Sequence, residues 1–482
     1  MTKLTKALVL SAVALAAGCS MAPKYERPEA PVATDWPGLR LARSLAVAPT
    51  TASTAVQTTA AADIEWQSFF SDPKLRLLIE AALRNNRDLR IAVLNIEQAR
   101  AQFQIRRADQ FPTVGASATG TRQPATGGNI SSVYTAGLAM TSYEIDFFGR
   151  VASLKDAALA QYLATEEGRK TTQISLIATV TNTWLSLLAD EELLAITAQT
   201  LATREESFKL SQLRFDNGAT SELDLRQAES LTEAARISLA QLQRQRALDE
   251  NLLTLLLGQP LTGELAAALP AGQALADAPL MVDVPAGLPS DLLTKRPDIR
   301  QAEQQLLAAN ANIGAARAAF FPRISLTASA GSASNHLSGL FESGTYGWTL
   351  APQLFLPLFD AGRNRAGLDS ANVNRDIAVA QYEKAIQTAF REVADALAGR
   401  ATLGEQLRAQ QAQASAEATR FKLSDLRYQN GIASQLDLLD AQRSLFAARQ
   451  AVVQTRLLQL QNQVTLYKTL GGGWTEPAAT TH

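Results

Sequence analysis

Hydrophobic and polar residues follow a helical period over most of this chain. The period persists without proline from about 151 to 216 and from about 363 to 429, and at about 1.5 Å per residue each stretch predicts a helix on the order of 100 Å long. Shorter helices are predicted at 88–109 and 298–320, each ended by a nearby proline.

Apolar side chains also recur at every seventh position. Apolar residues at every seventh position over such lengths indicate that long helices pack as coiled coils. The residues concerned are Val180, Leu187, Leu194, Leu201, Phe208 and Phe215 in the first half of the chain and Leu439, Phe446, Val453, Leu460 and Tyr467 in the second.

Between each shorter helix and the long helix that follows it, the pattern changes to period two. Apolar even-numbered and polar odd-numbered residues alternate at 113–119 and 323–330, and again at 134–141 and 346–350. These segments predict two hairpins of half-buried strands. Pro352 in the last strand is expected to mark a bulge or the end of regular pairing.

The same order of elements occurs twice, and two segments are nearly identical. Residues 208–229 and 421–442 agree at 13 of 22 positions, so we infer an internal duplication. A period above 200 residues is too long for a solenoid unit, so each copy is a large part of one object. We expect repeats at 63–257 and 297–470, a proline-rich linker at 258–296 and a C-terminal tail at 471–482.

The two similar segments are predicted to be the turns of long helical hairpins. Gly218 and Gly431, each preceded by Asn, supply a residue that adopts the left-handed conformation at a helix end. Ser221 and Ser434 are placed to cap the next helix, and an acidic residue follows three positions later in each copy. Each copy is therefore a helix, a strand hairpin and a long antiparallel helical hairpin.

The N-terminus has the pattern of an export signal. Lysines precede an apolar run that is too short to span a bilayer, so residues 1–18 are predicted to be a signal peptide. The motif LAAGCS at 15–20 is similar to a bacterial lipobox, which predicts a lipidated Cys19 followed by a tether at 19–62. The alternative is an ordinary cleaved signal with an incidental cysteine. Ser20, where inner-membrane lipoproteins usually carry Asp, favours the outer membrane.

Composition argues against several classes of function. With 45 basic and 46 acidic residues, no nucleic-acid partner is expected. Two His and one Cys leave the usual nucleophilic and metal-dependent sites without their residues, so we predict neither an enzyme nor a cofactor other than the lipid at Cys19.

Four amphipathic strands in an outer membrane protein cannot close a barrel alone. Every strand edge within a bilayer must be paired, and bacterial barrels need at least about eight strands. Two or three copies would complete a barrel, and a barrel continuous with a hollow helical bundle favours three. Even-numbered residues would then face lipid, and the Thr, Ser and Gly positions would face the lumen. We predict a mixed, mainly α-helical fold with four transmembrane strands per chain.

With these elements in place, the chain resembles the outer membrane factor family, the TolC-like efflux channels, and within it the OprM-like lipoproteins. The most specific motifs, besides the duplicated turns, are FFPRISLTAS at 320–329, PLFDAGRNRA at 357–366 and YKTLGGGW at 467–474. The resemblance implies a homotrimer with a 12-stranded barrel continuous with a periplasmic α-helical coiled-coil barrel. It also implies a passive exit duct for drugs or other small toxic solutes, served by an inner-membrane pump, proton-driven, and a periplasmic adaptor.

The resemblance further implies a periplasmic gate at the helical turns, with the adaptor docking at the turns that contain Gly218 and Gly431. The gate residues carried over by motif are Leu436, Asp440, Asp437, Tyr428 and Asp224. Helix capping offers a second explanation for Asp224 and Asp437. For Asp440 the alternative is a solvated coiled-coil face, and Leu436 could be a core residue.

Other functions stay open at this point. A periplasmic structural or adaptor lipoprotein could also have an anchor and a long helical hairpin, although an adaptor would need a compact β domain. Related ducts serve protein secretion and metal-ion export.

The anchor itself is testable. Cys19→Ala should leave the protein unlipidated, because the thiol is the acyl acceptor in a lipobox. Incorporation of labelled palmitate into the wild-type and variant proteins measures this. Equal labelling of both would refute the anchor.

Overall fold

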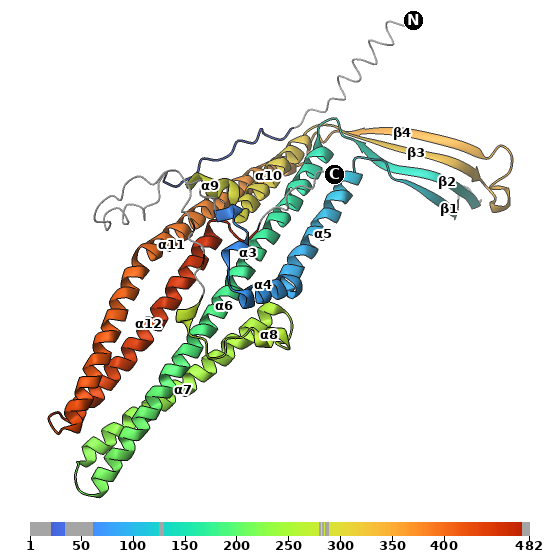
Figure 1. The fold of residues 1–482 in the computed structure, drawn as a ribbon. Helices are drawn as coiled ribbons and strands as arrows, with labels where there is room; N and C mark the ends of the chain where they lie inside the picture. Colours follow the sequence, from blue (N-terminus) through green and yellow to red (C-terminus); the bar gives the residue numbers. More distant parts are fainter. Residues whose placement is uncertain are drawn as a thin grey trace. The chain divides into compact units, whose positions relative to one another are not determined.

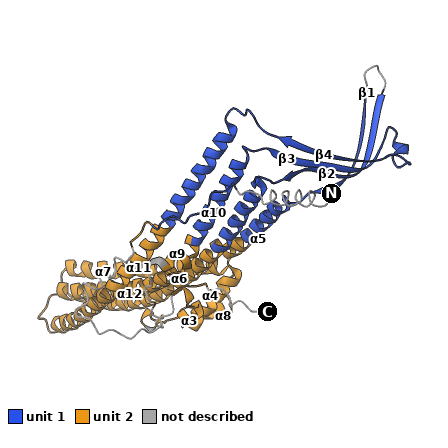
Figure 2. Cartoon of the chain, turned by 90° about the horizontal axis from the view of Figure 1, so that it is seen from above, with its two compact units in different colours: residues 1–30, 94–167, 300–385 blue, residues 31–93, 168–299, 386–482 orange. Residues whose placement is uncertain are grey.

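The structure is a computed structural model that describes residues 21–33, 61–124, 130–278, 281, 284 and 289–474. It divides into two compact units, which Figure 2 shows in different colours. Unit 1 comprises residues 1–30, 94–167 and 300–385, and unit 2 comprises residues 31–93, 168–299 and 386–482. Each unit thus contains segments of both predicted repeats. The predicted signal peptide and Cys19 lie outside the described residues.

Unit 1 contains the sheet and the helical segments next to it (Figure 1). Its helices come from α5 (Arg87–Ala108), α6 (Arg150–Asp216), α10 (Pro297–Ala318) and α11 (Arg363–Gln429). Its strands are β1 (Val114–Pro124), β2 (Ile130–Ile145), β3 (Arg323–Ser334) and β4 (Tyr346–Phe355), with the 3-10 turn η3 (Leu337–Gly339) before β4. Gly149 and Gly362, at φ of 70° and 87°, stand directly before the two long helices. The predicted strand hairpins and long helices are confirmed.

The four strands form one antiparallel sheet in the order β1-β2-β3-β4. Register aligns the apolar positions across it: Leu138 is paired with Ala116 and Ala330, and Ala330 is paired with Trp348. Leu138 is 57% and Trp348 72% exposed in the single chain. On the alternate positions the hydroxyls of Thr119 and Thr135 are 2.6 Å apart. One face of the sheet is therefore apolar and uncovered, and period two is confirmed.

Pro352 does not interrupt the sheet, so that prediction was wrong. It pairs with Leu326, and regular pairing of β3 with β4 continues to Phe355. The physical reason is its place in the last strand of the order, where a residue without an N–H is tolerated because one side of the strand has no partner among the described strands. The register shift lies instead in β2, between Met140 and Tyr143, where Ser142 has a φ of 51°.

Unit 2 is helical. Besides the remaining parts of α6 and α11 it contains α7 (Glu222–Leu257) and α12 (Gln435–Thr469), which complete two long hairpins that lie beside each other in Figure 1. The shorter elements are η1 (Ala61–Asp63), α3 (Trp66–Phe69), α4 (Pro73–Asn85), α8 (Glu264–Ala267), η2 (Leu275–Asp277) and α9 (Pro289–Lys295). Phe69 stacks on Tyr467 with ring centroids 3.9 Å apart, and the Tyr467 hydroxyl donates to the Ile64 carbonyl at 2.6 Å.

The positions at successive sevens are buried unevenly. Val180 and Leu187 in α6 and Val453 in α12 are at most 2% exposed, whereas Phe215 at the end of α6 is 36% exposed. Coiled-coil side chains are buried only where another helix faces them. In the single chain, apolar burial therefore decreases toward the turn of the first hairpin.

The described part of the predicted tether lies along α10. Residues 21–33 contain no helix or strand. The Arg27 guanidinium donates two hydrogen bonds of 2.7 Å to the Glu303 carboxylate, and the Tyr25 hydroxyl donates to the same carboxylate at 3.0 Å. At Gly314 of α10 a Cβ atom would lie 2.8 Å from the Ala22 nitrogen. Glycine thus allows the segment to approach the helix backbone closely.

Among the helices within the described ranges, none combines the length and the apolar character needed to cross a membrane.

A carboxyl pair lies between the helices of the first hairpin. Asp190 on α6 is only 6% exposed and lies near Asp249 on α7, and its Oδ2 has no hydrogen-bond partner among the described residues. Burial, followed by the hydrogen bond to Asp249 and the charge of Asp249, raises the pKa of Asp190 to about 7. Arg246 opposes this shift, while Glu191 adds to it. Burial beside a second acid therefore favours the protonated form of Asp190 up to near-neutral pH.

Replacing Asp190 tests the pair. In the wild type the unfolded chain releases this proton near 3.8 and the folded chain near 7, so the pair's contribution to stability falls as pH rises between those values. Asp190→Asn should raise the unfolding midpoint at pH 8 by on the order of 2–4 °C and change it little near pH 4. Asp395→Asn, which removes an exposed acid of α11, is the control. An equal effect of Asp190→Asn at both pH values would contradict the raised pKa of Asp190.

Candidate functional site

The two helical turns have the same backbone geometry. Gly218 and Gly431 have φ of 70° and 71°, and their N–H groups donate to the carbonyls of Phe215 at 2.9 Å and Tyr428 at 3.0 Å. A Cβ atom at either glycine would meet nothing within 4 Å. Backbone conformation, and not crowding, therefore requires glycine at these turns.

Each turn is followed by a capping box. The Ser221 hydroxyl accepts from the Asp224 N–H and Ser434 accepts from the Asp437 N–H, while each aspartate accepts from the backbone N–H of its serine. Hydrogen bonds from the Ser221 and Thr220 hydroxyls lower the pKa of Asp224. Capping therefore accounts locally for an acid at both positions.

Asp440 is held by two arginines. Arg420 of α11 donates to one carboxylate oxygen at 2.6 Å, and Arg443 of α12 donates to the other. These bonds, from Arg420 first and then Arg443, lower the pKa of Asp440. The Arg420–Asp440 ion pair thus joins the two helices of the second hairpin, and the Arg443–Asp440 pair lies within α12. The charge of Asp440 is retained to lower pH than that of an ordinary aspartate.

The ion pair has no counterpart in the first hairpin. At the positions that correspond to Arg420, Asp440 and Arg443, the first copy has Ser207, Gln227 and Ser230. Sequence reasoning identified Asp440 but missed both arginines. Comparison of the two copies would have found them, because all three charges are present in one copy and absent from the other.

Tyr428 joins the two hairpins. Arg214 of α6 donates to the Tyr428 hydroxyl at 2.5 Å, and its guanidinium carbon lies 5.1 Å from the ring centroid. Nearby, the Gln435 amide of α12 donates to the Ser211 hydroxyl at 2.7 Å and to the Asp224 carbonyl at 3.5 Å. Leu436 is 59% exposed, so in the single chain it is not a core residue. The contacts made by Arg214 and Gln435 were not predicted.

Comparison with known proteins identifies the family. A model described as outer membrane efflux protein matches residues 78–259 and 288–472. The antibiotic efflux pump outer membrane protein ArpC and the toluene efflux pump outer membrane protein TtgC, both of Pseudomonas putida, are each 48% identical over 483 residues, which is 99% of this chain and 97% of theirs. The open state of the MtrE outer membrane channel of Neisseria gonorrhoeae matches with a TM-score of 0.83 at 40% identity, covering 94% of this chain and 98% of that one.

The four-stranded sheet and the paired helical hairpins, together with these matches, are those of an outer membrane channel protein. The chain belongs to the outer membrane efflux protein family. It is the outer membrane exit channel of a tripartite efflux system and extends into the periplasm. The resemblance to TolC-like channels is confirmed.

The turn geometry makes one substitution diagnostic. Gly431→Val places a β-branched residue at a φ of 71°, where a Cβ atom costs about 1–2 kcal/mol. Hydrogen exchange over residues 427–437 should then become about tenfold faster. Gly431→Asn is the matched control, because asparagine tolerates the left-handed conformation. Wild-type exchange in the valine variant would contradict the assignment of Gly431 to a strained turn.

Proposed function

We propose that three copies of this chain close one barrel of twelve strands, and that drugs and other small toxic solutes leave the cell passively through it. The observation that carries the proposal is the sheet. Within the part of the chain that the structure describes, its order leaves one side of β1 and one side of β4 without a partner strand. Unpaired backbone groups are not tolerated in lipid, and four strands are too few to close. Three sheets of four joined edge to edge remove every free edge.

The exposed apolar face supports the same arrangement. Leu138, Trp348 and Leu350 would contact lipid, and the aligned Thr119 and Thr135 would face an aqueous lumen. Pro352 would then lie at a joint between copies, where its missing N–H costs at most one hydrogen bond of the ladder. The internal duplication accounts for two similar strand hairpins in each copy.

The gate is proposed at the helical turns. Around a threefold axis, Asp440 would form a ring of three carboxylates, with Asp224, Asp437, Tyr428 and Leu436 beside it. Such rings favour cations and obstruct bulky solutes until the helices move apart. Opening would have to break the Arg214–Tyr428 hydrogen bond, which ties the two hairpins together. The Arg420–Asp440 pair, which lies within one hairpin, could persist.

The remaining partners follow from the tripartite system. We propose that a periplasmic adaptor docks on the turns at Gly218 and Gly431, that a proton-driven inner-membrane pump supplies the solutes, and that Cys19 carries the lipid. Passive conduction requires no cofactor. The names of the relatives ArpC and TtgC refer to antibiotics and toluene, which supports small lipophilic cargo here.

Planar-bilayer recording tests the proposal. The purified protein should migrate as a heat-modifiable trimer in unboiled electrophoresis and should conduct ions. Asp440→Ala should raise single-channel conductance and reduce cation preference, because it removes three carboxylates and leaves Arg443 without its acid, while Arg420 keeps Glu417. Asp395→Ala, in an exposed pair of the same hairpin, is the control.

The outcomes separate two claims. A solitary protein that does not conduct would overturn the trimeric channel. A conducting trimer in which Asp440→Ala changes neither conductance nor selectivity would reduce Asp440 to an interhelical ion pair.

A further inference from the structure

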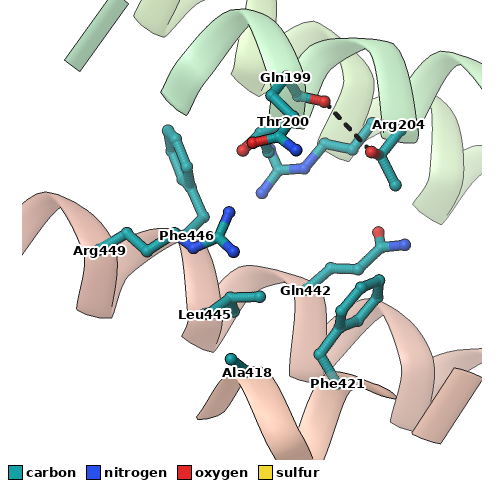
Figure 3. Close-up of a pocket in the computed structure, with 10 residues that line it drawn as sticks. Gln199, Thr200, Arg204, Ala418, Phe421, Gln442, Leu445, Phe446 and Arg449 are labelled. Carbon is teal, nitrogen blue, oxygen red and sulfur yellow. Dashed lines mark hydrogen bonds between the residues drawn. The ribbon is translucent and has the colours of Figure 1, made fainter. Parts of the chain in front are cut away.

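A cleft of about 160 Å³ lies between the two helical hairpins of unit 2. Its walls come from α6, α11 and α12 (Figure 3). Among the described residues that line it, six are polar and none is acidic. They are Gln199, Thr200, Thr203, Arg204, Gln442 and Arg449. The cleft is therefore polar and carries positive charge.

Arg204 is a buried cation with spare hydrogen-bonding capacity. It is only 4% exposed. One of its terminal nitrogens donates to the Leu231 carbonyl at 2.8 Å, and its guanidinium carbon lies 5.2 Å from the Phe446 ring centroid. Its Nε–H has no hydrogen-bond partner among the described residues. Burial lowers the pKa of Arg204, and no carboxylate counters this effect. Charges buried to this extent are normally paired.

Arg449 brings a second cation to the same cleft. Figure 3 shows the guanidinium groups of Arg204 and Arg449 extending toward each other from α6 and α12. Neither arginine forms an ion pair with a described residue. Three nearby acids are already engaged: Glu205 pairs with Arg236, and Glu417 and Asp440 both pair with Arg420.

The other polar side chains add little to this balance. The Thr200 and Thr203 hydroxyls donate to the carbonyls of Ile196 and Gln199 in their own helix. Their protons are therefore not available to a ligand. The two guanidinium groups are the charged donors in the cleft, and the side-chain amides of Gln199 and Gln442 also line it.

We propose that this cleft binds a small oxyanion, a carboxylate or a phosphate, between Arg204 and Arg449. A guanidinium fork matches two oxygens of such an ion, and charge-assisted bonds of this kind are the strongest hydrogen bonds in proteins. The volume corresponds to about five water molecules at roughly 30 Å³ each, which suits a small anion and is too small for a drug-sized solute. The ion would neutralise two like charges and tie α6 of the first hairpin to α12 of the second.

The binding site does not depend on the trimeric channel. It requires only the packing of two hairpins within one chain. Its occupant would favour the arrangement in which α6 and α12 stay close, so anion binding would oppose separation of the hairpins.

Thermal unfolding of the purified full-length protein in detergent tests the proposal. Inorganic phosphate and succinate are titrated separately, with sodium chloride at matched ionic strength as the reference. At least one of the two should raise the wild-type midpoint above the chloride reference, and the more effective one identifies the preferred oxyanion class. Arg449→Gln should weaken the apparent affinity for that anion about tenfold or more, because it removes one of two charged donors.

Two further variants complete the design. Arg204→Gln should abolish the anion-dependent shift, and Arg226→Gln, which removes an exposed arginine paired on the surface of α7, should leave it unchanged. Arg449 lies at a half-exposed position, so its variant remains informative if Arg204→Gln does not fold. The proposal is overturned if neither anion exceeds chloride in the wild type, or if Arg449→Gln responds as the wild type does.

Discussion

Backbone hydrogen bonding at the two outer strands is the constraint on which the structure depends. The sheet begins at β1 and ends at β4, and one side of each pairs with no other strand of the described residues. Each unpaired group in lipid costs several kcal/mol, so this sheet is compatible with a membrane only after other strands join it. The register that aligns Leu138, Ala330 and Trp348 on one face serves the same end, because a one-residue slip would turn that face away from lipid. In the proposed trimer, the membrane part would therefore complete its folding only when the copies assemble.

Features set by local sequence were predictable. The alternation of apolar and polar residues predicted the strands. Gly218, Ser221 and Asp224 define a turn and a helix cap within seven residues, as the structure shows. Features that depend on contacts between distant elements of the fold were not predictable. Pro352 is harmless only because β4 is last in the sheet order, which alternation cannot reveal. Arg420 reaches Asp440 from 20 residues away, across a turn, so no spacing rule for one helix applies. The Arg214–Tyr428 contact joins helices more than 200 residues apart.

The helical hairpins contain charges of two kinds. Asp440 accepts hydrogen bonds from two arginines. Asp190, in contrast, lies near a second acid, and Arg204 lies near a second cation. Each like-charge pair has one member on α6, and the other member lies on the helix that faces it. Interfaces of this type change their packing energy when a proton or an ion binds, while Val180 and Leu187 hold the same helix in place through burial alone. The first hairpin therefore combines fixed and chemically adjustable contacts along one helix.

The segment bound along α10 limits how far Cys19, and any lipid on it, can lie from the helix. Arg27 and Tyr25 donate hydrogen bonds to the Glu303 carboxylate, and the Met21 carbonyl accepts a hydrogen bond from Arg317. Only two residue spacings separate Met21 from Cys19, a reach of at most about 7 Å. Acyl chains on Cys19, if it is lipidated as proposed, would be held within that distance of Met21. A lipid anchor at Cys19, as proposed above, would therefore stay close to the end of α10 that carries Arg317.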